Sequence, residues 1–364
     1  MIQTEIAVIG GGPAGLCAAW AAAEAGAQVL LIDNSLTLGG QLIKQTHMFF
    51  GSQKQFAGTR GIDIAQKLVD RVIKQPRVTV MGNSTALGIY EDGTITVEQD
   101  EERVIPVTAE RIIVATGASE RTLAFPNNDL PGVYGAGAVQ TLMNVHGVRP
   151  GNRVLMVGAG NIGLIVTYQL LQAGVEVAAI VEAGESIGGY LVHAAKVRRA
   201  GVPILTRHTI KSAYGKDGVE GAVIWQLDDR WQGIAGTEQD LKVDVICLAV
   251  GLSPLSDLLW QAGCQMKYVA ELGGHVACRD HNLCTSKSNI YLAGDVAGVE
   301  EASSAMVEGQ VAGLAAALSL NFGDANTVSQ LADAKEQLAE LRRGPVGEKI
   351  RAGLSRVEGG VQHA

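Results

Sequence analysis

The chain reads IAVIGGGPAG from Ile6 to Gly15, so an apolar run ends directly on a glycine-rich turn. An Ala- and Leu-rich segment with helical character follows from Pro13 to Ala25, and a second apolar run, residues 29–32, ends on Asp33. Short apolar runs of this kind predict buried strands. Strand, glycine turn, helix, strand and acid in this order are typical of a unit that binds a dinucleotide.

Each glycine of this turn has its own physical role. Gly10 permits the tight turn, Gly12 lets backbone N–H groups approach a pyrophosphate, and Gly15 allows the helix to pack closely on the strand. The helix N-terminus faces the negative phosphates, and the Asp33 carboxylate accepts hydrogen bonds from ribose hydroxyls. The segment therefore predicts a dinucleotide site.

A second copy of this pattern lies further along the chain. It reads VLMVGAGNIG from Val154 to Gly163, and after an amphipathic helix another apolar run, residues 175–181, ends on Glu182. Each copy also has a distal apolar strand that ends on glycine, at 111–117 and at 244–251. Two dinucleotides in one chain predict a flavin, a nicotinamide and redox chemistry.

The glycine pattern alone is weak in a chain that holds 46 glycines among 364 residues. Two alternatives to a pair of dinucleotide sites therefore stay open. The glycines of either copy can be ordinary turn residues, and the second copy can keep the fold of such a site without binding a cofactor. If the second site binds a nicotinamide, Glu182 favours NAD. An acid at this strand end accepts from the free 2′-hydroxyl of NAD and repels the 2′-phosphate of NADP.

The composition predicts a chain with large buried cores. With 364 residues, 47% of them apolar and 18% charged, we expect two domains of ordinary size. A net charge of −8 argues against a nucleic-acid partner and against an anionic membrane surface. No apolar stretch is long enough for an integral membrane segment, and the first strand begins too early to leave room for a targeting signal, so we expect a cytoplasmic protein.

The cysteines argue against two other classes of protein. Their number is odd and they include no CxxC pair, which predicts neither a disulfide scaffold nor a metal site. We interpret Cys17, in the first expected helix, and Cys247, in an apolar strand, as small buried hydrophobic residues. The five cysteines are Cys17, Cys247, Cys264, Cys278 and Cys284.

The two copies predict an α/β fold of two Rossmann-like three-layer dinucleotide-binding domains, with the second inserted in the first. We expect the first domain at 1–120 and 256–320, because a strand-like run that ends in Gly-Asp resumes after the second copy. The second domain is expected at 121–255, and residues 321–364 form a C-terminal helical tail. One face of the tail is apolar and packs either on the chain's own domains or on another subunit. That face carries Leu331, Ala334, Leu338 and Leu341.

Four short motifs together resemble one enzyme family. GGGPAG at 10–15, GGQL at 39–42, ATG at 115–117 and AGD at 293–295 are similar to those of the two-dinucleotide-binding flavoprotein reductases that include thioredoxin reductase. The resemblance extends over residues 1–320 and implies FAD in the first site and NAD(P)H in the second. It implies FAD contacts at Gly10, Gly12, Pro13, Ala14, Gly15, Asp33, Asn34, Gly40, Gln41, Ala115, Thr116, Gly117, Gly294 and Asp295. It implies contacts with the second nucleotide at Gly158, Gly160, Asn161, Ile162, Gly163, Glu182 and Gly251.

The resemblance also implies individual roles in the FAD site. Asp33 binds the adenosine ribose and Asp295 binds a ribityl hydroxyl. Gly40 and Gln41 lie along the flavin, and the helix after the Gly-Asp motif aims its positive end at the flavin, where charge develops on reduction. We assign no catalytic residue, because the flavin itself carries the chemistry. Gln41 and His47, which border the expected flavin, are the two candidates.

One departure from thioredoxin reductase decides the subfamily. That enzyme carries a CxxC in its nicotinamide domain, whereas residues 121–255 here contain only Cys247, so dithiol chemistry is excluded. The chain more closely resembles the α-type subunits of heteromeric dehydrogenases that act on sarcosine, opines, proline or hydroxyproline, and a hydrogen cyanide synthase subunit. This resemblance rests on LPGV at 130–133, GAVQ at 137–140 and GAGNIG at 158–163.

The second resemblance implies partners. A second flavoprotein subunit oxidises an amine or a similar substrate, and electrons pass through iron–sulfur and flavin centres. The family often has a cysteine-rich 2Fe–2S segment after the Gly-Asp motif, but this chain has no cysteine beyond Cys284, so a separate small iron–sulfur subunit would supply that centre. Because family members also hold other adenine nucleotides in the second site, we expect NAD(H) or another adenine nucleotide there.

The sequence therefore predicts an FAD-dependent oxidoreductase, the electron-transferring subunit of a heteromeric amine or imino-acid dehydrogenase. The first alternative is a free-standing NAD(P)H-dependent flavin reductase that passes electrons to ferredoxin or quinone. The second is a structural nucleotide-binding subunit whose FAD does not turn over.

Overall fold

The computed structural model describes residues 2–345 and 347–358. Contacts between residues divide the chain into two compact units. The first unit combines Met1–Ser119 with Ser253–Ala364, and the second is Glu120–Leu252. The second unit is thus inserted in the sequence of the first.

A parallel sheet forms the centre of the first unit. Its strands, in spatial order, are β3 (Val78–Met81), β2 (Val29–Ile32), β1 (Ile2–Ile9) and β6 (Arg103–Val114), and β19 (Ile290–Leu292) pairs with β6. All four residues of β2 are buried, because layers on both sides cover a parallel sheet. This explains why the strand reads as the uninterrupted apolar run VLLI.

The long strand β6 has different partners at its two ends. Residues 103–108 pair antiparallel with β5 (Thr94–Gln99), which pairs in turn with β4 (Ser84–Ile89). Residues 112–114 pair parallel with β19. The strands β1, β6 and β19 therefore end at the same edge of the sheet, where the loops after parallel strands gather to bind ligands.

The first unit has three layers, with helices on one face of the sheet and the β4–β5–β6 meander on the other. Alternate residues of β1 point to opposite faces: Ile6 and Val8 belong to the core shared with the helices, whereas Ala7 and Ile9 belong to the core shared with the meander. The short helix α6 (Asp257–Gln261) also contributes to the meander core. The helices on the other face include α1 (Pro13–Glu24), α2 (Gly61–Lys74) and α7 (Ala302–Ser319).

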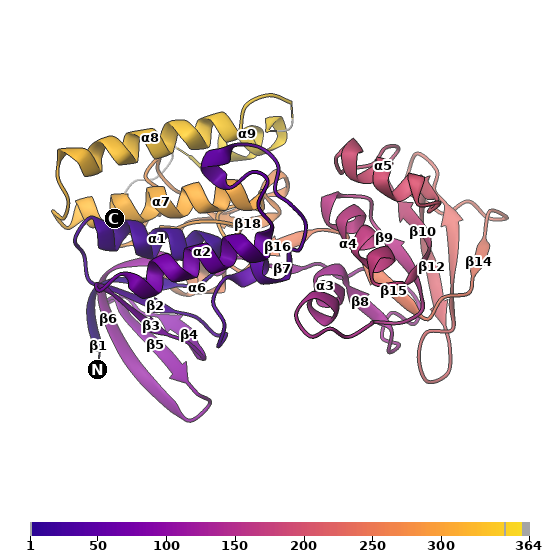
Figure 1. Ribbon diagram of the computed structural model, residues 1–364, viewed down its shortest axis with the longest axis horizontal. Coiled ribbons are helices and arrows are strands. Elements are labelled where there is room, and N and C mark those ends of the chain that lie inside the picture. The colour runs from indigo at the N-terminus through magenta and orange to yellow at the C-terminus, as the bar shows by residue number, and fades with distance from the viewer. Residues whose placement is uncertain (1, 346, 359–364) are drawn as a thin grey trace. The chain divides into compact units, whose positions relative to one another are not determined.

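Helices α1 and α7 lie side by side with their backbones in contact (Figure 1). A Cβ atom on Gly309 of α7 would lie 2.0 Å from the carbonyl oxygen of Ala14, and one on Gly313 would lie 2.3 Å from that of Ala18. The two glycines, one helical turn apart, face Ala14 and Ala18 in the same spacing. Such small residues let two helices approach more closely than ordinary side chains allow.

The C-terminal segment packs on the first unit itself. Helix α8 (Ala325–Leu341) lies beside α7 (Figure 1), and its residues Ala334 and Leu338 are buried in the core that α1 and α7 share. Leu331 and Leu341 are partly buried against the same core. The apolar face expected from the sequence therefore contacts the chain's own domain.

The last helix, α9 (Glu348–Leu354), packs on a small hairpin of the first unit. The hairpin consists of β17 (Met266–Val269) and β18 (Gly274–Ala277), joined by a 3-10 turn at Ala270–Leu272. Leu354 and Val357 share a buried cluster with its apolar residues. Two further 3-10 turns, at Gly40–Lys44 and Gln53–Gln55, follow β2.

The second unit repeats the same layering. Its parallel strands are, in spatial order, β11 (Ile204–Thr206), β10 (Glu176–Glu182), β9 (Arg153–Val157), β15 (Val245–Leu248) and β8 (Val133–Gly135). Helices cover one face and share a core with Val154 and Met156, whereas a meander covers the other face and packs on Leu155 and Val157. The helices are α3 (Ala136–Asn144), α4 (Asn161–Gln172) and α5 (Leu191–Arg199), and the meander strands are β12 (His208–Tyr214), β13 (Gly221–Gln226) and β14 (Gln239–Leu241).

Both units therefore have the helix, sheet and meander layers of a Rossmann-like domain, and the predicted fold class is confirmed. Two short strands, β7 (Ala118–Glu120) and β16 (Leu252–Pro254), lie where the sequence passes from one unit to the other. Across residues 2–345 and 347–358, no helix combines the length and apolar character needed to cross a membrane.

Candidate functional site: two nucleotide cradles

The first glycine loop connects β1 to α1. The N–H of Gly10 donates to the carbonyl oxygen of Ile32 at 2.8 Å, and its φ of +108° is a conformation that side chains disfavour. A Cβ on Gly10 would lie 2.3 Å from the carbonyl oxygen of Ala115, and one on Gly15 would lie 1.7 Å from that of Gly10. The backbone leaves no room for a side chain at these two positions.

Gly12 differs from its two neighbours because the space around it is open. It is the N-cap of α1, with φ −75° and ψ −174°, and a Cβ there would have no neighbour nearer than 3.9 Å, the Cα of Gly40. Glycine offers no side chain to the first N–H groups of the helix, and Pro13 occupies the first turn. An uncapped helix N-terminus with free space in front of it fits a phosphate group.

Asp33 lies at the end of β2, directly beside the loop. Its Oδ2 accepts a hydrogen bond from the Gly11 N–H at 2.5 Å, and its Oδ1 accepts from the Ser35 N–H at 2.7 Å. Each carboxylate oxygen has a second lone pair, so the group retains capacity for the hydroxyls of a ribose. Asn34, the other expected contact, is exposed next to it.

The Gly39–Gly40 turn lies against the first glycine loop. The Gly39 N–H donates to the carbonyl oxygen of Gly11 at 2.8 Å, and a Cβ on Gly40 would lie 2.8 Å from the Cα of Gly12. Gln41 follows on the surface of the 3-10 turn. The structure thus brings together the loop and the turn that the sequence analysis assigned to FAD.

The candidate His47 lies beyond that turn, and its ring stacks on Phe49 with the centroids 5.7 Å apart. Stacking on a neighbouring ring is sufficient reason for a half-buried histidine. The catalytic roles of His47 and Gln41 therefore stay predictions.

The third element of the cradle is the loop after β6. Ala115 donates its N–H to the carbonyl oxygen of Ile9 at 2.8 Å, so this loop runs beside the glycine loop. Thr116 Oγ1 donates to the carbonyl oxygen of Leu255 at 2.7 Å, and Gly117 has a φ of +75°. The residues of the ATG motif therefore lie beside the first glycine loop, and their contact with FAD stays a prediction.

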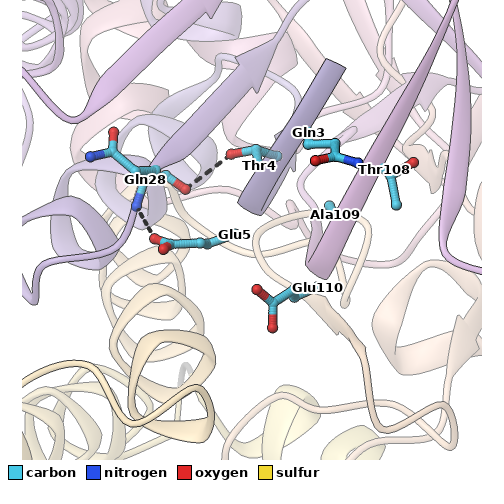
Figure 2. A pocket seen from close by; sticks show the side chains of 7 residues that line it. All are labelled: Gln3, Thr4, Glu5, Gln28, Thr108, Ala109 and Glu110. Atoms are coloured by element: carbon cyan, nitrogen blue, oxygen red, sulfur yellow. Dashed lines mark hydrogen bonds between the residues drawn. The ribbon is translucent and has the colours of Figure 1, made fainter. Parts of the chain in front are cut away.

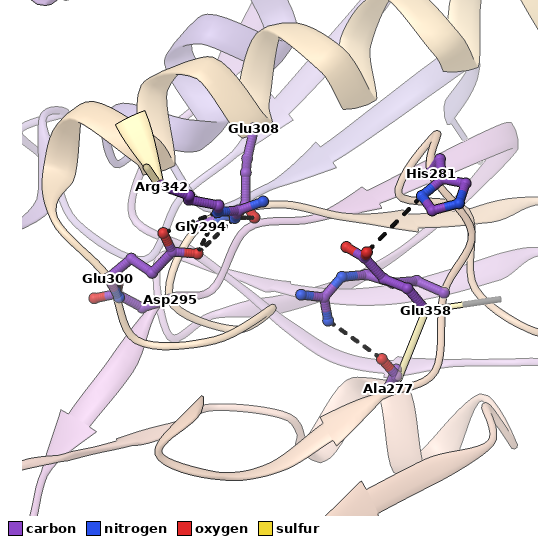
Figure 3. Close-up of polar contacts among 9 residues, drawn as sticks. Ala277, His281, Gly294, Asp295, Glu300, Glu308, Arg342 and Glu358 are labelled. Atoms are coloured by element: carbon purple, nitrogen blue, oxygen red, sulfur yellow. Dashed lines mark hydrogen bonds and ion pairs between the residues drawn. The ribbon is translucent and has the colours of Figure 1, made fainter. Parts of the chain in front are cut away.

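The Gly294–Asp295 turn follows β19 at the same edge of the sheet. Gly294 has a φ of +79°, and a Cβ there would lie 2.8 Å from the Cβ of Ala14 in α1. Burial, together with the negative charges of Glu308 and Glu300, raises the pKa of the Asp295 carboxyl to about 7. Figure 3 shows these acids close together around the turn.

The raised pKa of Asp295 predicts how the stability of the cofactor-free protein varies with pH. Below about pH 7 the folded protein holds this proton, whereas the unfolded chain releases it near pH 4. Stability from this group is therefore fully present below about pH 4 and falls as pH rises to about 7. We expect the free energy of unfolding of the natural chain to fall between about pH 5 and pH 8. Asp295→Asn should remove on the order of 2 kcal/mol of that fall.

Urea unfolding of both cofactor-free proteins at the two pH values measures this difference. Asp92→Asn is the control, because Asp92 is an exposed carboxyl whose pKa is lowered by the Thr94 N–H. An Asp295→Asn protein with the same pH dependence as the natural chain would contradict the assignment.

The second glycine loop, between β9 and α4, has the same geometry as the first. Gly158 has a φ of +109°, donates its N–H to the carbonyl oxygen of Val181 at 2.8 Å, and leaves only 2.3 Å between a Cβ and the carbonyl oxygen of Ala249. A Cβ on Gly163 would lie 2.1 Å from the carbonyl oxygen of Gly158. Gly160, the N-cap of α4, would meet nothing within 4 Å.

Glu182 occupies the place that Asp33 has in the first unit. Its Oε2 accepts from the Ala159 N–H at 2.8 Å and its Oε1 from the Gly184 N–H at 2.9 Å. Asn161 and Ile162 begin α4 directly after the loop. Gly251, with a φ of +112°, follows β15 as Gly117 follows β6.

In the second unit, the N-terminus of helix α3 is already capped by a carboxylate of the protein. The carboxylate of Glu120 accepts from the N–H of Gly137 at 2.6 Å and from that of Ala138 at 3.3 Å. An anion of the protein therefore already fills this helix end. The N-cap of α4 is a glycine without a side chain, which leaves that end for an anion from outside.

The sequence analysis missed one element of the second cradle. Gly188 and Gly189 repeat the Gly39–Gly40 turn: the Gly189 N–H donates to the carbonyl oxygen of Ala159 at 3.0 Å, and a Cβ on Gly189 would lie 2.8 Å from the carbonyl carbon of Gly160. The signal was present, because GGYL follows Glu182 as GGQL follows Asp33.

A hollow of about 470 Å³ lies in the first unit, and Figure 2 shows the residues that line it. It is at the beginning of β1, where Gln28 accepts a hydrogen bond from Thr4 Oγ1 at 3.0 Å and donates its N–H to Glu5 at 2.5 Å. Nucleotides bind at the other end of parallel strands. We assign no ligand to this hollow. Its lining is Gln3, Thr4, Glu5, Gln28, Thr108, Ala109 and Glu110.

Comparison with known proteins identifies the family. The family model described as pyridine nucleotide-disulphide oxidoreductase matches residues 4–309. The chain belongs to this family. The family assignment supports the prediction of an FAD-dependent oxidoreductase that binds FAD and a pyridine nucleotide, and confirms the resemblance on which that prediction rested.

Two curated relatives of this chain are named as subunits of oxidases. The alpha chain of sarcosine oxidase from Corynebacterium sp. (strain P-1) is 28% identical over 329 residues, which cover 88% of this chain and 33% of the relative. An opine oxidase subunit from Agrobacterium tumefaciens (strain Ach5) is 27% identical over 355 residues, which cover 93% of this chain and 70% of the relative. The chain thus spans about a third of the sarcosine oxidase relative.

Solved structures confirm the fold. L-proline dehydrogenase from P. horikoshii has a TM-score of 0.73 at 24% identity, covering 93% of this chain and 59% of that one. Thioredoxin reductase from T. acidophilum also has a TM-score of 0.73, at 19% identity, covering 88% of this chain and all of that one (100%). At these identities the likeness is one of fold.

Proposed function

We propose that this chain is the FAD- and nucleotide-binding, electron-transferring subunit of a heteromeric amine or imino-acid dehydrogenase of the cytoplasm. The first cradle holds FAD, and the second holds NAD(H) or another adenine nucleotide. Partner subunits are a second flavoprotein that oxidises the substrate and a small iron–sulfur protein. The substrate is of the sarcosine, opine, proline or hydroxyproline type.

The observation that carries this proposal is a complete second cradle without a reactive thiol. Cys247 is the one cysteine in residues 120–252, and it is fully buried in β15, where burial raises the pKa of its thiol. A buried neutral thiol does not exchange disulfides. A dithiol in this unit is therefore not the acceptor of the flavin's electrons, and the names of the relatives, which are enzyme subunits, support transfer to a partner subunit.

Residues of the first cradle divide the binding of FAD among them. The N-terminus of α1 in front of Gly12 receives the pyrophosphate, Asp33 the adenosine ribose, and Asp295 a ribityl hydroxyl. The Gly40–Gln41 turn borders the flavin. Once bound, FAD supplies the electron transfer, while the protein positions it and sets the charge around it.

The charges at the end of β10 support NAD over NADP for the second cradle. Arg207 follows Thr206, the residue that pairs with Glu182, and its N–H donates to the carbonyl oxygen of Gly184 at 2.9 Å. Its guanidinium forms ion pairs with Glu185 and Asp229. The cation is therefore already neutralised, and Glu182 repels a 2′-phosphate. Calorimetric titration with NADH and NADPH should give the tighter binding for NADH.

Anaerobic reduction of the FAD-loaded chain tests the proposed function. We expect neither NADH nor sarcosine, proline or hydroxyproline alone to bleach the visible flavin band. Addition of the proposed partner flavoprotein should permit bleaching by one of these imino or amino acids. A chain that retains no FAD would overturn the proposal.

The same experiment separates the two alternatives. Rapid bleaching by NADH in the isolated chain would identify a free-standing NAD(P)H-dependent flavin reductase. An unchanged flavin band even with all partner proteins present would identify a structural subunit whose FAD does not turn over.

A further inference from the structure

Two glutamates form hydrogen bonds with the Gly294–Asp295 turn. The Oε2 of Glu308, in α7, accepts the Gly294 N–H at 2.8 Å. The N–H of Glu300 points to Asp295 Oδ1 over a longer distance of 3.4 Å. Each glutamate is bonded to one of the two residues of the turn, so their positions decide where the Asp295 carboxylate points.

Both glutamates converge on one arginine (Figure 3). Arg342 Nη2 lies 2.5 Å from Glu300 Oε1 and 2.5 Å from Glu308 Oε1, and its Nε donates to Glu300 Oε2 at 3.0 Å. The side chains of Arg342 and Glu300 are each 9% exposed, and that of Glu308 is 3% exposed. Two buried carboxylates this close together require a cation between them.

Arg342 belongs to the C-terminal segment, which the sequence analysis treated as a tail apart from the cofactor site. It follows α8, and its N–H donates to the carbonyl oxygen of the buried Leu338 at 3.2 Å. Its own carbonyl oxygen accepts a hydrogen bond from the side chain of Arg351, in α9. Helices on both sides thus hold the backbone of Arg342 in place.

We propose that Arg342 is a positioning residue of the FAD site: through Glu308 and Glu300 it fixes the turn that presents Asp295 to the cofactor. This inference rests on the proposed function, because it requires FAD in the first cradle. The C-terminal segment is accordingly part of that cradle. Without Arg342, the two glutamates repel each other and Asp295, and the turn loses its support.

The test is a double-mutant cycle on FAD affinity, measured by equilibrium dialysis of the full chain. Arg342→Gln should weaken FAD binding about tenfold or more, because it removes charged hydrogen bonds that hold the turn. In an Asp295→Asn background the same change should have little effect, since the group through which Arg342 acts is gone. If Arg342 has only a structural role unrelated to Asp295, Arg342→Gln weakens FAD binding equally in the natural chain and in the Asp295→Asn chain. That result would overturn the proposal.

Arg356→Gln is the matched control. Arg356 belongs to the same segment and pairs at 2.9 Å with Glu271, in a contact that is more exposed to solvent than the Arg342 pairs. It should leave FAD affinity unchanged, and an effect as large as that of Arg342→Gln would overturn the inference. If Arg342→Gln does not fold, Arg342→Lys, which keeps the charge but loses the paired contacts with Glu300, is measured in the same cycle.

The cycle also separates this inference from the proposed function. Failure of the natural chain to bind FAD would defeat both. FAD binding by the natural chain that Arg342→Gln leaves unchanged would defeat only the role of Arg342.

Discussion

Gly12→Asp should abolish FAD binding while leaving the chain folded. The backbone at Gly12 is extended and its surroundings are open, so an aspartate fits. Aspartate is also a favourable N-cap, which supports α1. Its carboxylate would occupy the place of the pyrophosphate, and two like charges about 4 Å apart near a protein surface repel by about 4 kcal/mol, close to a thousandfold in affinity.

Equilibrium dialysis and far-ultraviolet circular dichroism measure the two parts of this prediction. Gly12→Asn separates charge from bulk, because asparagine caps the helix equally well without the negative charge. Its loss of affinity should be smaller. A folded Gly12→Asp chain that still holds FAD would remove the first cradle from the proposal.

The equivalent change in the second cradle provides an internal control. Gly160 is the N-cap of α4 in the same extended conformation, with nothing within 4 Å of a Cβ. Gly160→Asp should therefore retain FAD but lose binding of NADH or ADP. Loss of FAD in this variant would show that the two sites are not independent.

Gly309→Val should destabilise the protein by about 3 kcal/mol or more. A Cβ at this position would lie 2.0 Å from the carbonyl oxygen of Ala14 and 2.8 Å from its carbonyl carbon. These are backbone atoms of a buried helix, which cannot move aside as a flexible side chain would. Helices α1 and α7 would have to separate, and the core that they share would open.

Urea denaturation at neutral pH measures this loss. Gln310→Val is the control: it adds the same β-branched side chain to the same helix at a half-exposed neighbour. It should cost well under 1 kcal/mol by helix propensity alone. A Gly309→Val chain as stable as the Gln310→Val chain would show that the two helices can separate without cost.

The two glycine loops could be predicted because each is a local structure. The strand, the turn, the helix and the acid lie within about 25 residues of one another, and each glycine has a reason that the backbone alone supplies. The Gly188–Gly189 turn is equally local, and its signal is the GG pair that follows each acid at the same distance, six residues after Asp33 and six after Glu182.

The C-terminal segment shows where local patterns end. Its apolar face could be recognised from helical spacing, but which surface covers that face depends on contacts far away in the sequence. Ala334 and Leu338 pack on a core built from residues that begin at Ile6. Periodicity indicates that a face is buried and does not indicate by what.

The sequence by itself determined that this chain has an α/β fold with two glycine loops of the dinucleotide-binding kind, and that it is an oxidoreductase. Only the tertiary structure distinguished Arg342 from Arg343, two adjacent arginines of the same kind. The side chain of Arg342 is 9% exposed and that of Arg343 is 74% exposed. The difference arises because Glu300 and Glu308, 42 and 34 residues earlier in the chain, meet Arg342 behind the Asp295 turn. Long-range charge pairing of this kind has no local signature, since it exists only after the helices have packed.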